Sequence, residues 1–176
     1  MNNMKAKPQL SVSEALNEAK RKLTQLNGRS RRSEYWWTAL VLGVCGWFLG
    51  FIPIVGSIIT LAVSLIMIPL GVRRLHDSGH SGKWYAACMI VGFCTGAIYF
   101  YKIIPILDKY ADNAEKMIRK LGEVYADPLV ICSMLASFVL GIIVLVFLCQ
   151  DSKPEPNKWG VSPKYGLGDD DIEVIE

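Results

Sequence analysis

The chain has 176 residues, of which 52% are hydrophobic with glycine left out of the count, and its mean hydropathy is +0.30. Soluble globular domains contain about 45–50% apolar residues even with glycine included, so the composition argues against a soluble domain. The net charge is +3. The charged residues are concentrated between long apolar runs, which predicts an all-α, polytopic membrane protein with four transmembrane helices.

The first predicted element is an amphipathic helix over residues 11–27, SVSEALNEAKRKLTQLN. Ser11 and Glu14 have the spacing of a capping box, and Asn27-Gly28 supplies a stop. Its apolar side chains share one face: Val12, Ala15, Leu16, Ala19, Leu23 and Leu26. With basic residues on the polar side, this helix is expected to lie on the inner leaflet or to pack against the protein itself.

An uncharged apolar run follows from Trp36 to Leu70. It is too long for one pass through about 30 Å of hydrocarbon and about right for two. Backbone polar groups in lipid must be satisfied within their own segment, so both passes should be helical. The predicted elements are a helix near residues 36–51, a turn at Ile52-Pro53 and a helix near residues 54–70.

Two further apolar runs complete the set. Trp84–Tyr101 can extend to about Leu107 if Lys102 snorkels, and Leu129–Cys149 is the cleanest run of the chain. Between them, Ile106–Tyr125 has apolar residues at near-heptad spacing. We predict one amphipathic helix there, at the outer headgroups or as a docking surface for a partner.

Basic residues dominate the segment before the first run and the connection after the second. The positive-inside rule therefore places both termini and the loop of residues 71–83 in the cytoplasm. Residues 102–128 carry five basic and five acidic residues and are nevertheless predicted to lie outside. No cleavable signal peptide is expected. The predicted organisation is a cytoplasmic amphipathic segment (1–35), a four-helix transmembrane domain (36–149) and a cytoplasmic tail, disordered at its end (150–176).

The apolar runs contain no charged residue well inside them. Ion pathways and proton relays usually need intramembrane ionisable groups, so the sequence argues against a pump or a coupled transporter. The five cysteines all lie in or at the ends of apolar runs, and none forms a C-x-x-C pair. We interpret them as small apolar packing residues rather than a disulfide framework or metal ligands.

Three polar motifs flank the predicted spans: GRSRRSEYWW (28–37), RRLHDSGHSG (73–82) and PNKWGVSP (156–163). In this order the chain resembles the YhaH/YhaI-like family of small bacterial inner-membrane proteins, a domain-of-unknown-function family, over about residues 23–165. The resemblance implies a multi-spanning inner-membrane protein and no particular activity. The chain departs from the family pattern at Lys83-Trp84-Tyr85, where a tryptophan pair is usual, and in the approach to Asn157.

The charged connection from Gly71 to Tyr85 has three interpretations. Its basic residues can serve only to orient the protein in the membrane. Alternatively, the basic residues near one membrane face can bind an anionic lipid headgroup, because arginine forks hold phosphate oxygens and basic pockets between helices bind acidic lipids. The candidate anion-binding residues are Arg31, Arg32, Arg73, Arg74 and Lys83.

The third interpretation is a zinc or other divalent-metal site formed by His76, Asp77 and His80. The two histidines have the i, i+4 spacing of helical zinc ligands. The Ser-Gly pairs that follow Asp77 and His80 argue against a continuous helix, and these are the only two histidines of the chain.

The three motifs are expected to fold into one polar cap, formed by Arg29–Trp37, Arg73–Tyr85 and Asn157–Pro163. We predict that Glu34 or Asp77 pairs with an arginine of the opposite motif, and that Asn157 and Trp159 hydrogen-bond and stack in the cap.

The function predicted from these residues is that of a non-enzymatic inner-membrane protein whose cap binds anionic lipid headgroups or a protein partner. The alternative is a small metal-dependent enzyme or metal-binding protein acting at phospholipid headgroups. No cofactor is expected beyond that divalent metal. The expected partners are membrane lipids, a protein partner or further copies of the chain, and not nucleic acid.

Overall fold

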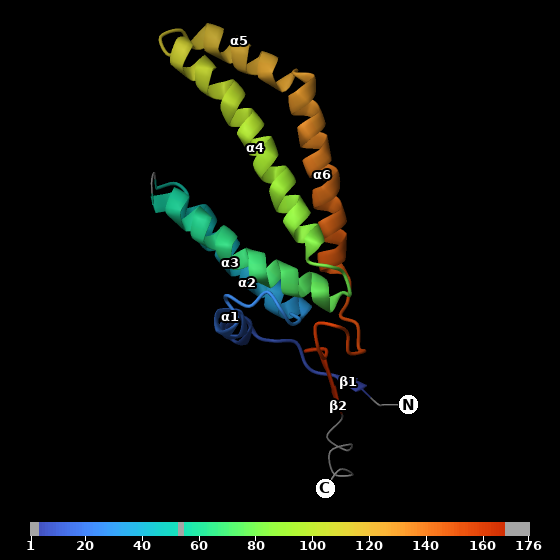
Figure 1. Cartoon of the computed structure of the whole chain (residues 1–176). Helices are drawn as coiled ribbons and strands as arrows, with labels where there is room; N and C mark the ends of the chain where they lie inside the picture. Colours follow the sequence, from blue (N-terminus) through green and yellow to red (C-terminus); the bar gives the residue numbers. More distant parts are fainter. Residues whose placement is uncertain (1–3, 53–54, 168–176) are drawn as a thin grey trace. The chain divides into compact units, whose positions relative to one another are not determined.

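A computed structural model describes residues 4–52 and 55–167 of the chain, most of which are helical (Figure 1). The chain forms two compact units, one from the described parts of Met1–Tyr85 and Phe147–Glu176 and one from Ala86–Val146. We call them unit 1 and unit 2. The elements in order are β1 (Met4–Ala6), α1 (Val12–Arg21), α2 (Arg32–Leu49), α3 (Val55–Asp77), α4 (Lys83–Lys109), α5 (Ala114–Tyr125), α6 (Pro128–Cys149) and β2 (Tyr165–Leu167).

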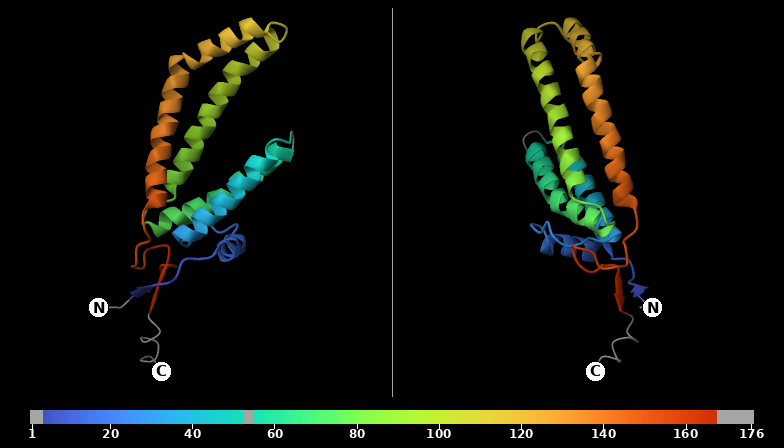
Figure 2. Two further views of the ribbon diagram at one scale, coloured as in Figure 1. Left: turned by 180° about the vertical axis from the view of Figure 1, so that it is seen from behind. Right: turned by 45° about the vertical axis from the view of Figure 1, so that its right-hand side comes forward.

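Unit 1 is built on the hairpin of α2 and α3, which lie side by side in all views, with α1 packed against α2 (Figure 2). The predicted capping box starts α1: Glu14 N–H donates to Ser11 Oγ (3.4 Å), and Ser11 N–H donates to Glu14 Oε2 (2.8 Å). The predicted helix over 11–27 is too long, because α1 ends at Arg21. Its buried residues are the two alanines Ala15 and Ala19, which allow close approach to α2.

The first predicted span begins too late and the second ends too early. Helix α2 starts at Arg32 rather than 36, and α3 continues through Asp77 rather than ending near Leu70. The prediction of a connecting loop from Gly71 is therefore wrong for its first half. The helix continues past the apolar run because its last charged side chains are paired inside unit 1 and need no water. The predicted turn at Ile52-Pro53 lies partly outside the described residues.

The end of α3 is fixed by glycine. Gly79 has φ +85°, a left-handed conformation that favours glycine, so the helix cannot continue to His80. Gly71 lies under the ring of Tyr85, and a Cβ atom there would stand 2.4 Å from that ring. The start of α4 can therefore pack directly against the backbone of α3.

The two ends of the described chain meet in unit 1. Strands β1 and β2 pair antiparallel, with Lys5 opposite Gly166. The pairing continues one step further, because Lys7 N–H donates to Lys164 O at 2.8 Å. The sequence does not predict this pairing, since strands of three residues carry no periodic signal.

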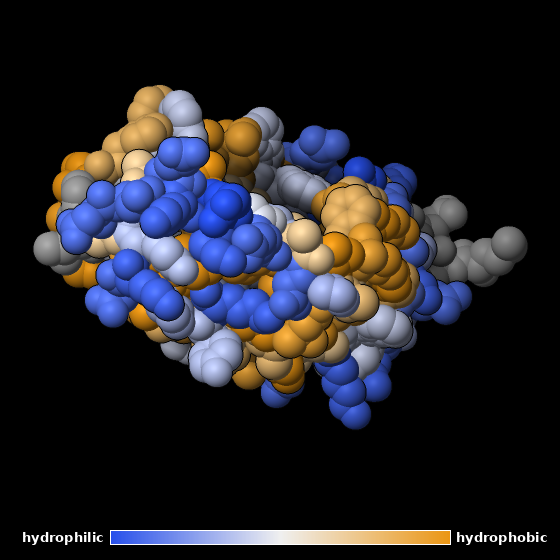
Figure 3. Space-filling model, turned by 90° about the horizontal axis from the view of Figure 1, so that it is seen from above, coloured by the Kyte–Doolittle hydropathy of each residue, from blue (hydrophilic) through white to orange (hydrophobic). Residues whose placement is uncertain are grey.

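Unit 2 consists of α5 and of all but the first residues of α4 and the last residues of α6; α4 and α6 run in opposite directions, and α5 connects them (Figure 1). The single helix predicted over Ile106–Tyr125 is wrong: α4 ends at Lys109, and Asn113 caps a separate helix by accepting a hydrogen bond from Lys116 N–H at 3.0 Å. Seen from above, hydrophilic residues gather over part of the near surface, with hydrophobic residues beside them (Figure 3). The last predicted span agrees with α6 to within one residue.

Among the described residues, three helices are long and apolar enough to cross a membrane, α3, α4 and α6. The chain is therefore a helical membrane protein. Helix α2 is less apolar because its first turn contains Arg32 and Glu34.

Candidate functional site

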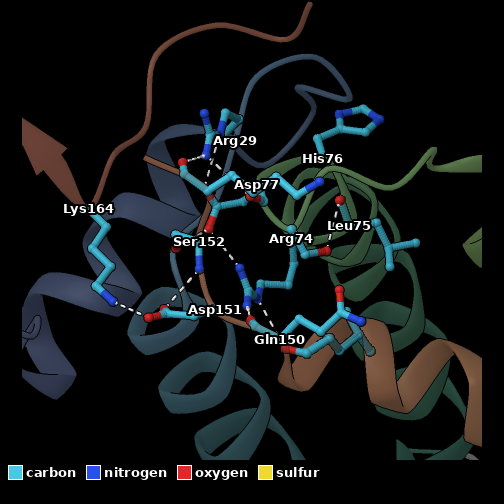
Figure 4. Close-up of polar contacts among 12 residues, drawn as sticks. Arg29, Arg74, Leu75, His76, Asp77, Gln150, Asp151, Ser152 and Lys164 are labelled. Atoms are coloured by element: carbon cyan, nitrogen blue, oxygen red, sulfur yellow. Dashed lines mark hydrogen bonds and ion pairs between the residues drawn. The ribbon is translucent and has the colours of Figure 1, made fainter. Parts of the chain in front are cut away.

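Asp77 is the centre of a buried polar cluster in unit 1 (Figure 4). Its Oδ1 accepts a hydrogen bond from Arg29 Nε at 3.0 Å, and its Oδ2 accepts one from Arg74 Nη1 at 2.6 Å and another from Ser152 Oγ. The exposed fractions of the Asp77 and Arg74 residues are both 0%. A carboxylate removed from water in this way needs such partners, because an unpaired buried charge is strongly destabilising.

A second buried ion pair joins α2 to α3. Arg73 Nη2 donates to Glu34 Oε1 at 3.2 Å, and Arg73 Nη1 also donates to the carbonyls of Lys22 and, at 3.0 Å, Gln25. The pair thereby attaches the segment after α1 to the end of α3.

The two pairs confirm the predicted link between the first two motifs, and they do so reciprocally. The carboxylate of the first motif, Glu34, contacts Arg73 of the second, and the carboxylate of the second, Asp77, contacts Arg29 of the first. The arginine of the first motif was not singled out beforehand. Nothing in the sequence around Arg29 distinguishes it from Arg31 and Arg32, so only the tertiary structure shows which of them pairs with Asp77.

The third motif closes over the other two, as predicted. Asn157 Nδ2 donates to His76 O at 2.9 Å, and the rings of Trp159 and His76 stack with centroids 4.1 Å apart. Arg29 Nη1 also donates to the Glu155 carbonyl at 2.9 Å. The three segments of the polar cap are therefore in mutual contact.

Arg74 connects the cap to the end of α6. Its Nε donates to Leu148 O at 3.1 Å and its Nη2 donates to Gln150 O, which satisfies carbonyls that a helix C-terminus leaves without intrahelical partners. Ser152 completes the connection through Asp77. Gln150 and Ser152 were missed in the sequence analysis because they lie outside the three motifs.

The five candidate anion-binding residues have different environments. The guanidinium groups of Arg73 and Arg74 are buried and donate to protein acceptors, as described above. Arg31 Nη2 donates to Pro8 O at 2.5 Å but also lines a pocket. Arg32 is exposed and lines the same pocket, whereas Lys83 is exposed and does not.

We call this cavity of about 460 Å³ the basic pocket. Its residues come from both ends of the described chain, from the start of α2 and from the segment just after α6. Four are basic, one is acidic, and the apolar side consists of two tryptophans and a leucine. The lining residues are Lys7, Gln9, Arg31, Arg32, Ser33, Trp36, Trp37, Leu40, Asp151 and Lys164.

One ion pair forms part of the wall of the basic pocket. Lys164 Nζ donates to Asp151 Oδ2 at 2.5 Å. This hydrogen bond lowers the pKa of Asp151 below its usual range and raises the pKa of Lys164. The pair neutralises the only carboxylate of the lining, so the other three basic side chains set the sign of the pocket.

The proposed metal ligands do not converge in the structure. Asp77 contacts arginines and Ser152, the His76 ring stacks on Trp159 and points away from Asp77 (Figure 4), and His80 Nε2 lies 2.7 Å from Gln150 Oε1. In residues 4–52 and 55–167, no group of three His, Cys, Asp or Glu side chains is placed to hold a metal ion.

The apolar helices and the buried cap together define a small helical membrane protein with a polar core at one end of its α2–α3 hairpin. The comparison with known sequences gives the family. The profile of the family described as "Protein of unknown function (DUF805)" matches residues 23–161, and the chain belongs to this family.

Two curated relatives agree with the predicted resemblance. Inner membrane protein YhaI of Escherichia coli K12 is 24% identical over 148 residues, covering 80% of this chain and 86% of the relative. Its counterpart in Escherichia coli O157:H7 gives the same values. No solved structure matches the chain.

Proposed function

We propose that the chain is a four-span inner-membrane protein with both termini and the polar cap in the cytoplasm. Helix α2 would be the fourth span: its 18 residues would extend about 27 Å at 1.5 Å per residue, close to the thickness of the hydrocarbon. Leu40, Val44 and Phe48 are exposed along it, as expected for a surface facing lipid. The excess of basic residues in the N-terminal segment supports the orientation.

Single-cysteine labelling in a cysteine-free background tests this topology. Cysteines at Gln9 and Lys158 should react only from the cytoplasm, and cysteines at Phe51 and Asp112 only from the periplasm. Reaction of the Gln9 and Phe51 positions from the same side would show that α2 does not span.

We further propose that the protein is not an enzyme and that its cap binds the headgroup of an anionic lipid. The observation that carries the proposal is the basic pocket, whose lining contains Lys7, Arg31, Arg32 and Lys164 but a single carboxylate. Arg73 and Arg74, by contrast, pair with carboxylates inside the cap. The proposal therefore rests on Arg32, the exposed arginine at the start of α2.

Native mass spectrometry of the full chain, from detergent containing phosphatidylglycerol and phosphatidylcholine, tests the headgroup. The wild type should retain the anionic lipid preferentially. Arg32→Gln should weaken retention about fivefold, because one basic residue near an anionic surface contributes about 1 kcal/mol. Arg21→Gln is the matched control, since Arg21 is exposed and lies outside the pocket. Equal retention of both lipids, or of the anionic lipid by wild type and Arg32→Gln, would contradict the proposal.

A further inference from the structure

The lining of the basic pocket has two chemically different parts. One is basic and comes from the chain ends and the start of α2, and the other, which we call the apolar wall, consists of Trp36, Trp37 and Leu40. Its volume of about 460 Å³ lies within the range of about 300–1,000 Å³ typical of small-molecule sites. A phosphate ion alone would fill only the charged part and would leave the apolar wall in water.

The side chains change in order along one face of α2. Arg32, Trp36, Leu40 and Val44 follow at intervals of four residues, so they lie in a row about 18 Å long at 1.5 Å per residue. The row runs from a charge through an aromatic ring to aliphatic groups, all of them exposed. Tryptophan prefers the headgroup level of a bilayer, so this order matches the order of groups along a phospholipid.

Arg32 is available at the charged end of this row. Within the described part of the chain no hydrogen bond or ion pair occupies its guanidinium. The neighbouring cations are partly engaged: Arg31 donates to Pro8 O, and Lys164 donates to Asp151. A guanidinium can hold two phosphate oxygens at once, so Arg32 is the best-placed group to orient a phosphodiester.

We infer that the basic pocket takes a whole anionic phospholipid, with the phosphate held by Arg32 between Lys7 and Lys164 and one acyl chain along Trp36, Leu40 and Val44. This inference rests on the proposed headgroup binding and names its ligand as an amphiphile. The shared chemistry is a phosphate group, which a soluble phosphate could also supply. The test therefore compares these two sources.

The experiment measures displacement of phosphatidylglycerol from the full chain in mild detergent by native mass spectrometry. The competitors are inorganic phosphate, glycerol phosphate and short-chain phosphatidylglycerol. We expect the short-chain lipid to displace the bound lipid at concentrations at least about tenfold below those of the two soluble phosphates, because only the lipid buries the apolar wall. Equal displacement by glycerol phosphate would overturn the inference and leave the headgroup proposal intact.

Variants at Leu40 test the acyl-chain track separately from the charge. Leu40→Trp narrows the apolar wall, Leu40→Gln makes it polar, and each should weaken lipid retention about fivefold or more. Leu61→Trp and Leu61→Gln are matched controls, because Leu61 of α3 is similarly exposed and lies outside the pocket. Tryptophan fluorescence melting of each variant verifies folding.

The outcomes separate the two claims. Unchanged retention in both Leu40 variants, together with weakened retention in Arg32→Gln, would remove the acyl-chain track and keep the headgroup site. Unchanged retention in Arg32→Gln would remove both. Weakened retention in the Leu61 variants to the same extent as in the Leu40 variants would show general membrane contact instead of a pocket.

Discussion

Different kinds of interaction stabilise the interiors of unit 1 and unit 2. The described residues of unit 1 include six buried charged side chains, Arg29, Arg31, Glu34, Arg73, Arg74 and Asp77. Among the described residues of unit 2, the buried ones are three valines, and large side chains such as Phe93, Phe100 and Phe138 are exposed. Unit 1 therefore has a specific polar core, whereas unit 2 depends on an apolar surrounding to cover its helices.

The polar contacts of unit 2 are correspondingly modest. Thr95 Oγ1 lies 2.8 Å from Ser137 Oγ, and it donates to Ser133 O at 3.2 Å. Its two ion pairs, Lys102 with Asp127 and Lys120 with Glu123, are partly exposed. This difference predicts that replacing a single buried polar side chain destabilises unit 1 strongly, whereas replacing a polar side chain in unit 2 has a small effect.

The largest effect is expected for Asp77→Asn, which leaves Arg29 and Arg74 without a compensating charge. Removing one partner of a buried ion pair costs about 3–5 kcal/mol. All five tryptophans of the chain belong to unit 1, so melting followed by tryptophan fluorescence reports on this unit. Asp151→Asn is the matched control, since it removes the same charge from an exposed pair. Similar melting temperatures for Asp77→Asn and wild type would contradict the polar core.

An intermediate effect is expected for Thr95→Val in unit 2. Interhelical hydrogen bonds in membranes contribute about 0.6 kcal/mol on average. Cys132 belongs to unit 2 and is a free thiol, so its reactivity during denaturation in sodium dodecyl sulfate reports on this unit. Ser64→Ala is the control, because Ser64 donates within its own helix to Thr60 O. A loss comparable to that of Asp77→Asn would remove the distinction between the units.

The smallest effect concerns pH and the pair of Asp151 and Lys164. Because the folded-state pKa of Asp151 is lowered, its stabilisation is present above the unfolded value of about 3.9 and is lost as the pH falls through the folded value. Because the pKa of Lys164 is raised, its contribution is present below about 10.4 and is lost as the pH rises through the folded value.

The measurement is the difference in melting temperature between wild type and Asp151→Asn at several pH values. The difference should be small and constant near neutral pH and should vanish in acid, where the wild-type carboxyl is protonated. A difference that persists in acid would mean that the pair contributes through shape and not through charge.

Much of the fold follows from the sequence in physical terms. Lipid-length apolar runs must be helical, so the runs that became α3, α4 and α6 could be located, and the capping box fixed the start of α1. The helix boundaries in the cap could not be located in this way. From their charge alone, Arg73 and Asp77 are expected in a loop. In the structure they extend α3, because Glu34 and Arg29 pair with them in the interior.

The same limit applies to the candidate site. A carboxylate–arginine link between the first two motifs could be predicted. Which arginine forms it could not, because the arginines of GRSRRSEYWW and RRLHDSGHSG have similar neighbours in the sequence. Tertiary structure assigns Arg29, Arg73 and Arg74 to the core and leaves Arg32 exposed. Lys7 and Lys164 join the pocket only because β1 pairs with β2.

The sequence by itself therefore determined the class of protein, because hydrophobic length and charge placement act locally along the chain. The tertiary structure decided which charges are neutralised and which stay available to a ligand, because the ion pairs between the motifs join residues 39 and 48 positions apart. No local pattern encodes those distances, and they separate the buried arginines that hold the cap together from Arg32, which stays exposed in the basic pocket.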